Sequence, residues 1–520
     1  MNIIDWINVG KVSAERDDLL SKYFHDNGVL KSVIESQNAF LVLGRKGAGK
    51  TAVFKFLKEN TTSYLKHDDV LVSLSFEDYN WSIHALLKND ESAESLCYKQ
   101  SWRFILLIEA VKAFSEYYQK SSLPLPRQLE QCNKLLKKLF SDPIPSIYSI
   151  IGRKLLSLSK LKLPSGGLDI EGGNLDSVEA SAGEVTFEEV KSDNSLQSQL
   201  SRNIDNVISF VEAALLAIQD TPCRVFLAFD RIDEAWDIVA VDTSKKVIAG
   251  LVGAADSINS KYGGKIRPII FLREDIFEVL PINDLNKLRE DCGSLLKWDK
   301  DSLIKLVLKR INYFAGLNSV TPVSDVDALF DKIEMRQRTK PSSYLLKRSM
   351  MRPRDMICLL NRTIDAMKEK ANDPFGDSQI VFEKLEAEAI YDAEPGYSDW
   401  LKQELIDEWA VQYPPIKVIL DALQNHGMTN FTQADLKGNL EKFNQKPSDT
   451  DLITYLRFLF DNSIIGFRVG ASNVWKYKCF YPSQGFVQAD DYRIHDGLIR
   501  TLNLKEPRAR EDDPAQAAAS

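Results

Sequence analysis

The sequence predicts an α/β fold whose core is a parallel sheet covered by helices. Three observations support this prediction: short apolar runs alternate with segments of helical period, the first run leads into a glycine-rich turn, and a later run ends in a carboxylate. Helical segments between successive strands are typical of parallel sheets. The apolar runs of strand length lie at residues 38–43, 70–76, 224–229, 266–272 and 294–298.

The composition is that of a folded protein without membrane spans. A chain of 520 residues predicts two to four packed units. Hydrophobic residues make up 44% and charged residues 27%, and no stretch approaches the roughly 18 apolar residues that cross a bilayer. The first residues lack the basic segment and apolar core of a secretory signal, so we expect a cytoplasmic location.

Cysteine, histidine and charge patterns argue against several kinds of site. The six cysteines form no CxxC pair, which favours reduced thiols over a disulfide framework or a zinc site. The five histidines are dispersed, so no metal cluster or catalytic dyad is evident. A net charge of −8 argues against bulk attraction to nucleic acid, although a local basic patch remains compatible with it.

The first predicted strand runs into a complete phosphate-binding loop. Residues 44–51 match GxxxxGK[ST] between a predicted strand and a helical stretch, Lys50 to Lys58. The glycines permit a tight loop whose N–H groups face phosphate oxygens; Lys50 reaches the β and γ phosphates, and the Thr51 hydroxyl ligates magnesium. We therefore expect ATP and Mg²⁺ as ligands, since no guanine-reading motif is evident. The predicted nucleotide-binding residues are Gly44, Arg45, Lys46, Gly47, Ala48, Gly49, Lys50 and Thr51.

The third predicted strand ends in the carboxylate that a magnesium nucleotide site needs beside its phosphate loop. Asp230 follows the run 224–229 and is predicted to share the metal with Thr51. Glu234 is the preferred residue for orienting the attacking water, and Asp233 is the second candidate. The alternative is that Asp233, Glu234 and Asp237 cap the next helix.

Phe229-Asp230-Arg231-Ile232-Asp233-Glu234 resembles the DGLDE form of the Walker B motif in NACHT and related STAND ATPases. The departure is Arg231, because those families usually carry a small residue there. The guanidinium alters the local packing that the resemblance implies and leaves the carboxylates in place.

The resemblance also implies two arginine sensors. Arg273, after the run 266–272, resembles the sensor 1 residue beside the γ-phosphate; the alternative is an ion pair with Asp230 or Asp233. Met351-Arg352-Pro353-Arg354-Asp355 resembles the start of the AAA+ and STAND lid, where Arg354 is sensor 2; the alternative is an exposed basic helix start. The catalytic residues implied are Glu234, Asp233, Arg273 and Arg354.

Motifs spread over nearly the whole chain resemble one prokaryotic P-loop ATPase family that often occurs near anti-phage defence genes. Among them, the phosphate loop and Walker B are individually specific. The resemblance implies a homo-oligomer and an effector protein as possible partners. The motifs are Ala14-Glu15-Arg16-Asp17, GRKGAGKTA, DRIDEAW, FLRED, RPRD and Tyr492-Arg493-Ile494-His495-Asp496-Gly497-Leu498.

The C-terminal part has the element order of a winged helix. Three helical patterns, at 416–425, from Thr432 onward and at 449–462, precede two alternating runs that predict a β-hairpin. Arg468, Lys476 and Lys478 on this wing are the candidates for a DNA backbone contact. Acidic residues outnumber basic ones from 396 to 506, however, so packing against the ATPase core or a partner protein is the alternative.

These patterns predict a core that is interrupted once and followed by two further parts. A stretch punctuated by Gly and Pro, Glu394-Pro395-Gly396, marks the expected boundary before the last domain. The expected parts are residues 1–80 and 195–318 as P-loop ATPase core, 81–156 as helical insertion, 157–194 as flexible loop, 319–394 as helical lid, 395–505 as winged-helix-like domain and 506–520 as disordered tail.

The function predicted from these features is an ATP-hydrolysing switch of the STAND or AAA+ kind, with a possible role in anti-phage defence. One alternative is a DNA- or RNA-binding ATPase, a loader or remodeller that uses the winged helix. The other is a signalling scaffold that binds ATP and turns it over slowly. No pattern supplies a nuclease, protease or deaminase, so an effector activity would come from a partner or from a site that the sequence patterns do not reveal.

Overall fold

The computed structural model describes residues 2–76, 97–140, 155–162, 168, 187–234, 241–372, 381–469 and 474–507. Contacts divide the chain into two compact units, which are described separately. The sheet unit comprises Gly28–Arg45 and Lys50–Leu296; the helical unit comprises Met1–Asn27, Lys46–Gly49 and Lys297–Ser520. Within the described ranges, no helix combines the length and apolar composition needed to cross a membrane.

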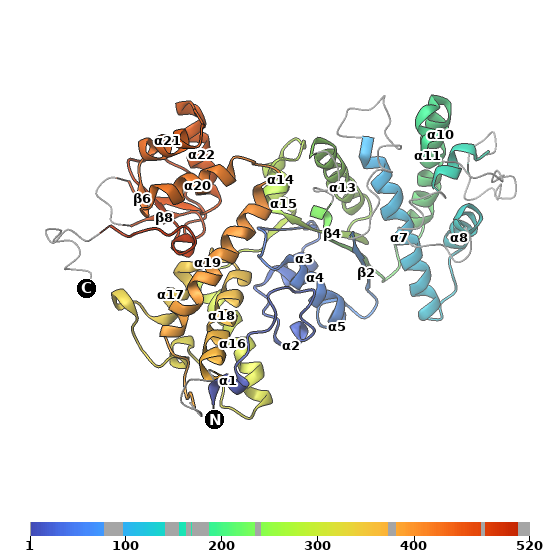
Figure 1. The fold of residues 1–520 in the computed structure, drawn as a ribbon. Coiled ribbons are helices and arrows are strands. Elements are labelled where there is room, and N and C mark those ends of the chain that lie inside the picture. The colour runs from blue at the N-terminus through green and yellow to red at the C-terminus, as the bar shows by residue number, and fades with distance from the viewer. Residues whose placement is uncertain are drawn as a thin grey trace. The chain divides into compact units, whose positions relative to one another are not determined.

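The core of the sheet unit is a five-stranded parallel sheet in the order β2-β3-β4-β1-β5 (Figure 1). All five predicted strands are confirmed, with small shifts at their ends. Because β4 lies between β1 and β3, its last residue, Arg273, pairs in register with Gly44 of the phosphate loop. The strands are β1 (Leu41–Gly44), β2 (Val70–Ser75), β3 (Val225–Asp230), β4 (Ile266–Arg273) and β5 (Gly293–Leu295).

Helices cover both faces of this sheet, which explains why its strands are apolar throughout rather than alternating. Phe271 of β4 packs edge-on against Phe54 of α4 (Lys50–Glu59) on one face. The flanking residues Ile270 and Leu272 point to the other face. They join the core formed with α7 (Cys97–Lys120) and α13 (Val241–Lys261).

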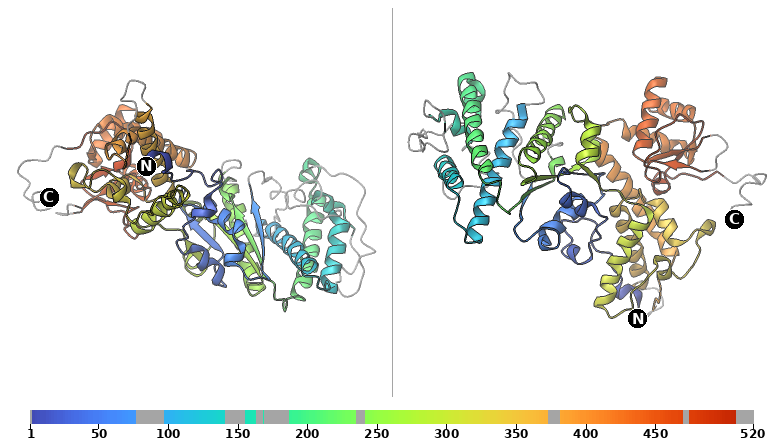
Figure 2. Two further views of the ribbon diagram at one scale, coloured as in Figure 1. Left: turned by 90° about the horizontal axis from the view of Figure 1, so that it is seen from below. Right: turned by 180° about the vertical axis from the view of Figure 1, so that it is seen from behind.

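The expected helical insertion is helical where the structure describes it. Helix α7 packs against α8 (Arg127–Phe140) and α11 (Asn194–Leu216) on one side and against β2 and α13 on the other (Figures 1 and 2). The Trp102 indole donates to the Val247 carbonyl, and Glu212 pairs with both Arg103 and Lys261, so α7, α11 and α13 are tied together. The insertion is therefore packed on the sheet unit.

The expected flexible loop at 157–194 is regular at both ends. A 3-10 helix, η2 (Ser157–Lys160), receives hydrogen bonds from the Asn203 side chain, and α10 (Phe187–Ser192) precedes α11. Residues 163–167 and 169–186 lie outside the described residues.

The N-terminal residues group with the helical unit and not with the sheet, unlike the expected 1–80 core. A buried cluster explains this: Arg310 donates to the Val9 carbonyl (2.8 Å) and Asp17 (3.2 Å), and the Tyr23 hydroxyl also donates to Asp17. Arg310 lies in α16 (Lys300–Leu317), so the segment containing α1 (Ile3–Trp6) and α2 (Leu20–Tyr23) is held on that helix.

The secondary structure continues through Glu394-Pro395-Gly396, where the sequence predicts a domain boundary. Helix α19 runs without interruption through Glu388–Trp409, with Pro395 inside it. Gly396 serves packing, because a Cβ there would lie 2.7 Å from a guanidinium nitrogen of Arg362 on α18 (Pro353–Ala371). The same unit contains α17 (Pro341–Arg348), η5 (Val326–Leu329) and η6 (Arg336–Arg338).

The C-terminal part has the helices and hairpin of a winged helix. Helix α20 (Ile416–His426) is followed by α21 (Gln433–Lys442) and α22 (Asp449–Asp461), and Thr432 and Ser448 each begin their helix with a capping box. Strand β7 (Ile465–Phe467) pairs antiparallel with β8 (Lys476–Tyr477), which confirms the predicted hairpin.

Two further strands complete the sheet of the C-terminal part, which has the order β6-β9-β7-β8. Strand β6 (Asn430–Phe431) and strand β9 (Tyr492–Ile494) pair with each other, and β9 also pairs with β7. Residues 470–473 and 508–520, which include most of the predicted disordered tail, lie outside the described residues.

Two glycines of the helical unit give a matched test of this packing. A Cβ at Gly497 would come within 3.0 Å of the Arg348 carbonyl oxygen, whereas a Cβ at Gly438, on the exposed side of α21, meets nothing within 4 Å. We expect Gly497→Ala to lower the free energy of unfolding by about 1–3 kcal/mol. Gly438→Ala should raise it by about 0.5–1 kcal/mol. Chemical denaturation of this unit measures both, and equal effects would contradict the packing at Gly497.

Candidate nucleotide site

The phosphate loop joins the end of β1 to the start of α4 and depends on its glycines. Gly47 and Gly49 have φ of 78° and 99°, the left-handed region that residues with a side chain rarely adopt. In the sheet unit, the Lys50 ammonium donates to the Gly44 carbonyl (3.1 Å) and the Arg45 carbonyl (3.3 Å). Burial lowers the pKa of Lys50, and Asp233 offsets part of this effect.

Asp230 and Thr51, the two predicted magnesium ligands, lie together. Asp230 is 3% exposed and accepts hydrogen bonds from the Thr51 hydroxyl and the Arg231 backbone N–H. Burial and, to a smaller extent, Asp233 raise the pKa of Asp230 to about 6, although these bonds and Lys50 act in the opposite direction. A hydroxyl and a carboxylate are the hard oxygen donors that Mg²⁺ takes beside phosphate and water, so the pair fits this ion.

Asp233 and Glu234 lie in the 3-10 turn η4 (Ile232–Glu234) that follows β3. Asp233 is close enough to act electrostatically on both Lys50 and Asp230. The backbone of Glu234 is described, but its side chain and Asp237 lie outside the described residues. The next helix that the structure describes is α13 (Val241–Lys261), and residues 235–240 between η4 and this helix lie outside the described residues.

Arg231 occupies a strained position between the two carboxylates. Its φ is 63°, in the left-handed region where a non-glycine residue is uncommon. Strain of this kind persists only where the surrounding structure imposes it, and here it lies next to the predicted metal ligand.

Arg273, the predicted sensor 1 residue, forms an ion pair that the sequence interpretation did not include. It contacts Asp275 through two nitrogens, at 2.8 and 3.2 Å. Burial is the largest influence on the pKa of Lys50 and lowers it, and Asp233 raises it. The charge of Arg273 lowers it further, so this charge acts on the phosphate loop. Asp275 follows Arg273 by two residues, and this spacing was the available signal.

In the helical unit, two arginines of the predicted lid motif lie against the turn of the phosphate loop. A Cβ at Gly47 would be 3.3 Å from the Arg354 Cβ and 3.5 Å from the Arg352 Cδ. The Lys46 carbonyl accepts from Arg352 at 3.4 Å, and the Ala48 carbonyl accepts from the Trp298 indole at 2.8 Å. Arg354 is therefore not an exposed basic helix start.

Carboxylates that sequence reasoning missed hold these two arginines. Arg352 pairs with Asp355 at 3.1 Å and Glu408 at 3.3 Å, and Arg354 pairs with Glu404 at 2.7 Å. Burial alone would lower the pKa of Arg352, but Asp355 and Glu408 outweigh it and raise that pKa. Glu404 and Glu408 lie on α19, some fifty residues from the lid motif, so sequence spacing gave no signal for them.

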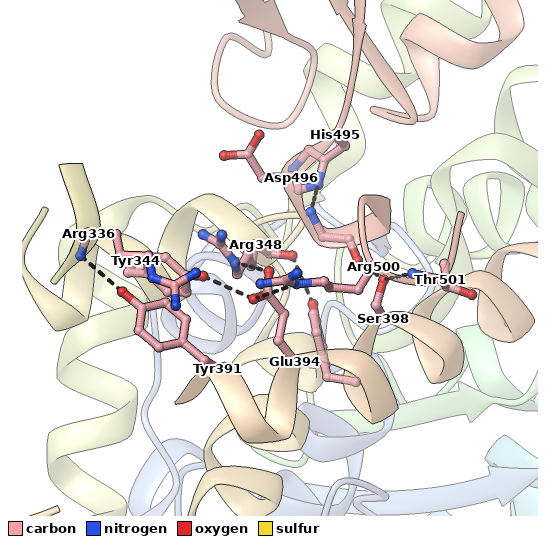
Figure 3. Close-up of polar contacts among 12 residues, drawn as sticks. Arg336, Tyr344, Arg348, Tyr391, Glu394, Ser398, His495, Asp496, Arg500 and Thr501 are labelled. Atoms are coloured by element: carbon pink, nitrogen blue, oxygen red, sulfur yellow. Dashed lines mark hydrogen bonds and ion pairs between the residues drawn. The ribbon is translucent and has the colours of Figure 1, made fainter. Parts of the chain in front are cut away.

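The motif Tyr492–Leu498 has a structural place in the helical unit (Figure 3). It forms β9 and the short helix η7 (Asp496–Leu498), which His495 begins by accepting the Gly497 N–H at 3.1 Å. His495 is fully buried, and this burial lowers its pKa to about 4. Ser398 of α19 donates to the Gly497 carbonyl at 2.7 Å, so the motif joins the wing sheet to α19.

The basic residues of the wing are held by neighbours of their own domain. Arg468 pairs with Asp491 at 2.6 Å and lies over the Trp475 ring. Lys476 and Lys478 donate to the side chain and the carbonyl of Gln484. These bonds weaken the case for the three residues as DNA backbone contacts.

The strand order, the glycine loop and the buried Asp230 together define a P-loop NTPase fold. Among the described residues, no group of three or more His, Cys, Asp or Glu could hold a metal ion. Thr51 and Asp230 are the residues that would hold a magnesium ion, with nucleotide and water completing its coordination.

Comparisons with known proteins add two sequence likenesses. A family model described as "FunZ-associated C-terminal helical domain" matches residues 301–406. The chain is 25% identical over 521 residues to the "Putative transposon gamma-delta 80.3 kDa protein" of Escherichia coli (strain K12), an alignment that covers 95% of this chain and 67% of that protein.

Three solved structures align with most of the chain at low similarity. The first is Drosophila ORC bound to DNA, with a TM-score of 0.31 and 9% identity over 96% of this chain and 90% of that chain. The second is Cdc6p from Pyrobaculum aerophilum, with a TM-score of 0.28 and 11% identity over 94% of this chain and 93% of that chain. The third is the ORC2 protein of Aeropyrum pernix, with a TM-score of 0.26 and 11% identity over 94% of this chain and 92% of that chain. These TM-scores are too low to identify a fold, so the fold is assigned from the strand order and loop geometry of this chain.

The raised pKa of Asp230 predicts a pH-dependent cost to stability. The folded protein holds a proton on Asp230 up to about pH 6, whereas the unfolded chain loses it near pH 3.9, so stability falls as pH rises between these values. We expect Asp230→Asn to stabilise the magnesium-free protein by about 1–3 kcal/mol near neutral pH, and by progressively less as pH falls from about 6 towards 4.

Thermal unfolding of wild type and variant across this pH range measures the effect. Asp242→Asn, at an exposed site, is the control and should cause a small change that does not depend on pH. A gain from Asp230→Asn that is the same at both ends of the range would contradict the burial argument.

Proposed function

We propose that this protein binds ATP with Mg²⁺ and hydrolyses it, acting as a conformational switch of the STAND or AAA+ kind. The observation that supports the proposal most is the hydrogen bond between the Thr51 hydroxyl and the buried Asp230, at the end of a glycine loop of the required pattern. A buried carboxylate with a raised pKa is costly unless a function uses it, and a metal cation would repay that cost.

Each residue of the site has a role in this proposal. The loop N–H groups and Lys50 hold the β and γ phosphates, and Thr51 and Asp230 ligate Mg²⁺, which supplies charge neutralisation when bound. Glu234 orients the attacking water, with Asp233 as second candidate. Arg273 and Arg354, both currently paired with carboxylates, approach the γ-phosphate as sensors 1 and 2.

The output of the switch is a change of conformation passed to a partner. Homo-oligomerisation, an effector protein and a role in anti-phage defence belong to the proposal, and they rest on the resemblance of the motifs alone. A nucleic-acid loader has less support, because Arg468 of the wing is paired with Asp491 and α22 begins with Asp449 and Asp451.

Phosphate release tests the ATPase proposal. Replacing Lys50 by Ala removes the cation that contacts the phosphates, so we expect Mg²⁺-dependent turnover to fall by a factor on the order of 100. Lys58→Ala, at the exposed end of the same helix, should keep wild-type turnover. Turnover that persists in Lys50→Ala would rule out this site as the catalytic one.

The same assay, with single-stranded and double-stranded DNA added, separates the alternatives. Turnover that DNA leaves unchanged supports the protein-triggered switch. A DNA-dependent increase that also requires Lys50 would instead establish the loader or remodeller.

A second substitution tests the assignment of the base. Glu234→Gln keeps the size and removes the charge, so we expect kcat to fall by at least about 100-fold while nucleotide affinity is retained. Asp233→Asn should reduce kcat less, and the reverse order would exchange the two roles. If wild type already turns over so slowly that Glu234→Gln changes nothing, the slow scaffold is the correct description.

A further inference from the structure

Two carboxylates of helix α19 bind the lid arginines. Glu404 and Glu408 are four residues apart, which places them one above the other on the same side of the helix. They bind Arg354 and Arg352, the residues that contact the turn of the phosphate loop. The loop turn is therefore connected to α19 by two adjacent ion pairs.

The two ion pairs differ in burial and therefore in how readily each arginine can exchange its partner. Arg352 is nearly buried, binds both Asp355 and Glu408, and donates to the Lys46 carbonyl, so every change of partner would leave a buried charge uncompensated. The Arg354 side chain is 31% exposed and its partner Glu404 is 24% exposed. A partly exposed pair of this kind is partly solvated and contributes less than a buried pair, so a stronger anion can replace Glu404.

We propose that Glu404 is a positioning residue: it holds Arg354 as a displaceable counter-ion, and the terminal phosphate of the bound nucleotide takes its place. The proposal rests on the nucleotide binding proposed above. Phosphate oxygens can accept two parallel guanidinium bonds and carry more charge than one carboxylate, so they compete effectively for Arg354. Glu404 thereby sets how much nucleotide is needed to move this arginine.

Release of Glu404 would act on a helix whose other half is fixed. Glu394, ten residues earlier on α19, is buried and accepts from Tyr344 (3.0 Å), Arg348 (2.5 Å) and Arg500 (3.4 Å), as Figure 3 shows. Helix α19 leads through a short connection into α20 of the winged helix. Nucleotide occupancy would thus remove one of the two ion pairs at the end of α19 that adjoins the C-terminal domain and leave Glu408 on Arg352 there, while Glu394 keeps the other end in place.

Binding of a non-hydrolysable ATP analogue tests the proposal. Glu404→Gln removes the competing charge without changing size, so we expect the analogue to bind about three- to tenfold more tightly, and ADP to bind as to wild type. Asp407→Asn, an equal loss of charge at an exposed position of the same helix, should have no such effect. Equal affinities for wild type and Glu404→Gln would overturn the proposal.

A double-mutant cycle shows whether the effect passes through Arg354. In an Arg354→Gln background, Glu404→Gln should no longer change analogue affinity, because the arginine that both anions bind is missing. An undiminished effect in that background would overturn the proposal. Glu404→Asp keeps the charge, so it should bind the analogue with nearly the wild-type affinity. If Glu404→Gln folds poorly, Glu404→Asp still distinguishes an effect of charge from an effect of packing.

Amide hydrogen exchange gives a measurement that would not change with nucleotide if Glu404 had only a structural role. In wild type, the analogue should speed amide exchange in residues 402–412, and in Glu404→Gln this exchange should already be fast without it. Unchanged exchange in wild type would overturn the proposal. Wild type that shows no Lys50-dependent binding of the analogue would instead refute the proposed function itself, so the two failures are distinguishable.

Discussion

The hydrogen bond between the Thr51 hydroxyl and the buried Asp230 carboxylate is the interaction on which the chemistry of the sheet unit depends. It joins the first turn of α4 to the end of β3, although β3 is not the neighbour of β1 in the sheet. Strand β4 fills the space between them and brings Arg273 into register with Gly44. The strand order thus places hydroxyl, carboxylate and guanidinium at one edge, as the carboxyl ends of parallel strands require.

The same arrangement accounts for the strain at Arg231. The chain must turn directly after Asp230 to bring Asp233 near Lys50, and a left-handed residue makes that turn. Glycine would adopt this conformation without penalty, whereas arginine does so at a cost on the order of 1 kcal/mol. The chain therefore tolerates local strain in order to keep both carboxylates beside the phosphate loop.

Local patterns were enough to predict the strands, the phosphate loop and the capped helices, because each depends on neighbouring residues. The run before Asp230 is apolar since both faces of β3 are covered, and Thr432 and Ser448 begin helices through contacts three residues away. Local signals did not predict that α19 continues through Pro395, next to a glycine that packs closely against Arg362. Glu404 and Glu408 were out of reach for the same reason, since a long-range contact leaves no periodicity in the sequence.

Burial decides which of the cations around the phosphate loop can change partners. Arg352 is held by two carboxylates inside the protein, and its raised pKa reflects how strongly they stabilise its charge. Arg273 binds the Asp275 carboxylate through two of its guanidinium nitrogens and is also buried. Arg354 binds Glu404 through one guanidinium nitrogen, and both side chains are partly exposed to solvent. Water can therefore solvate both charges when the pair separates. A device that responds to an anion needs one cation whose current partner is weak, and among these three arginines that condition is met at Arg354.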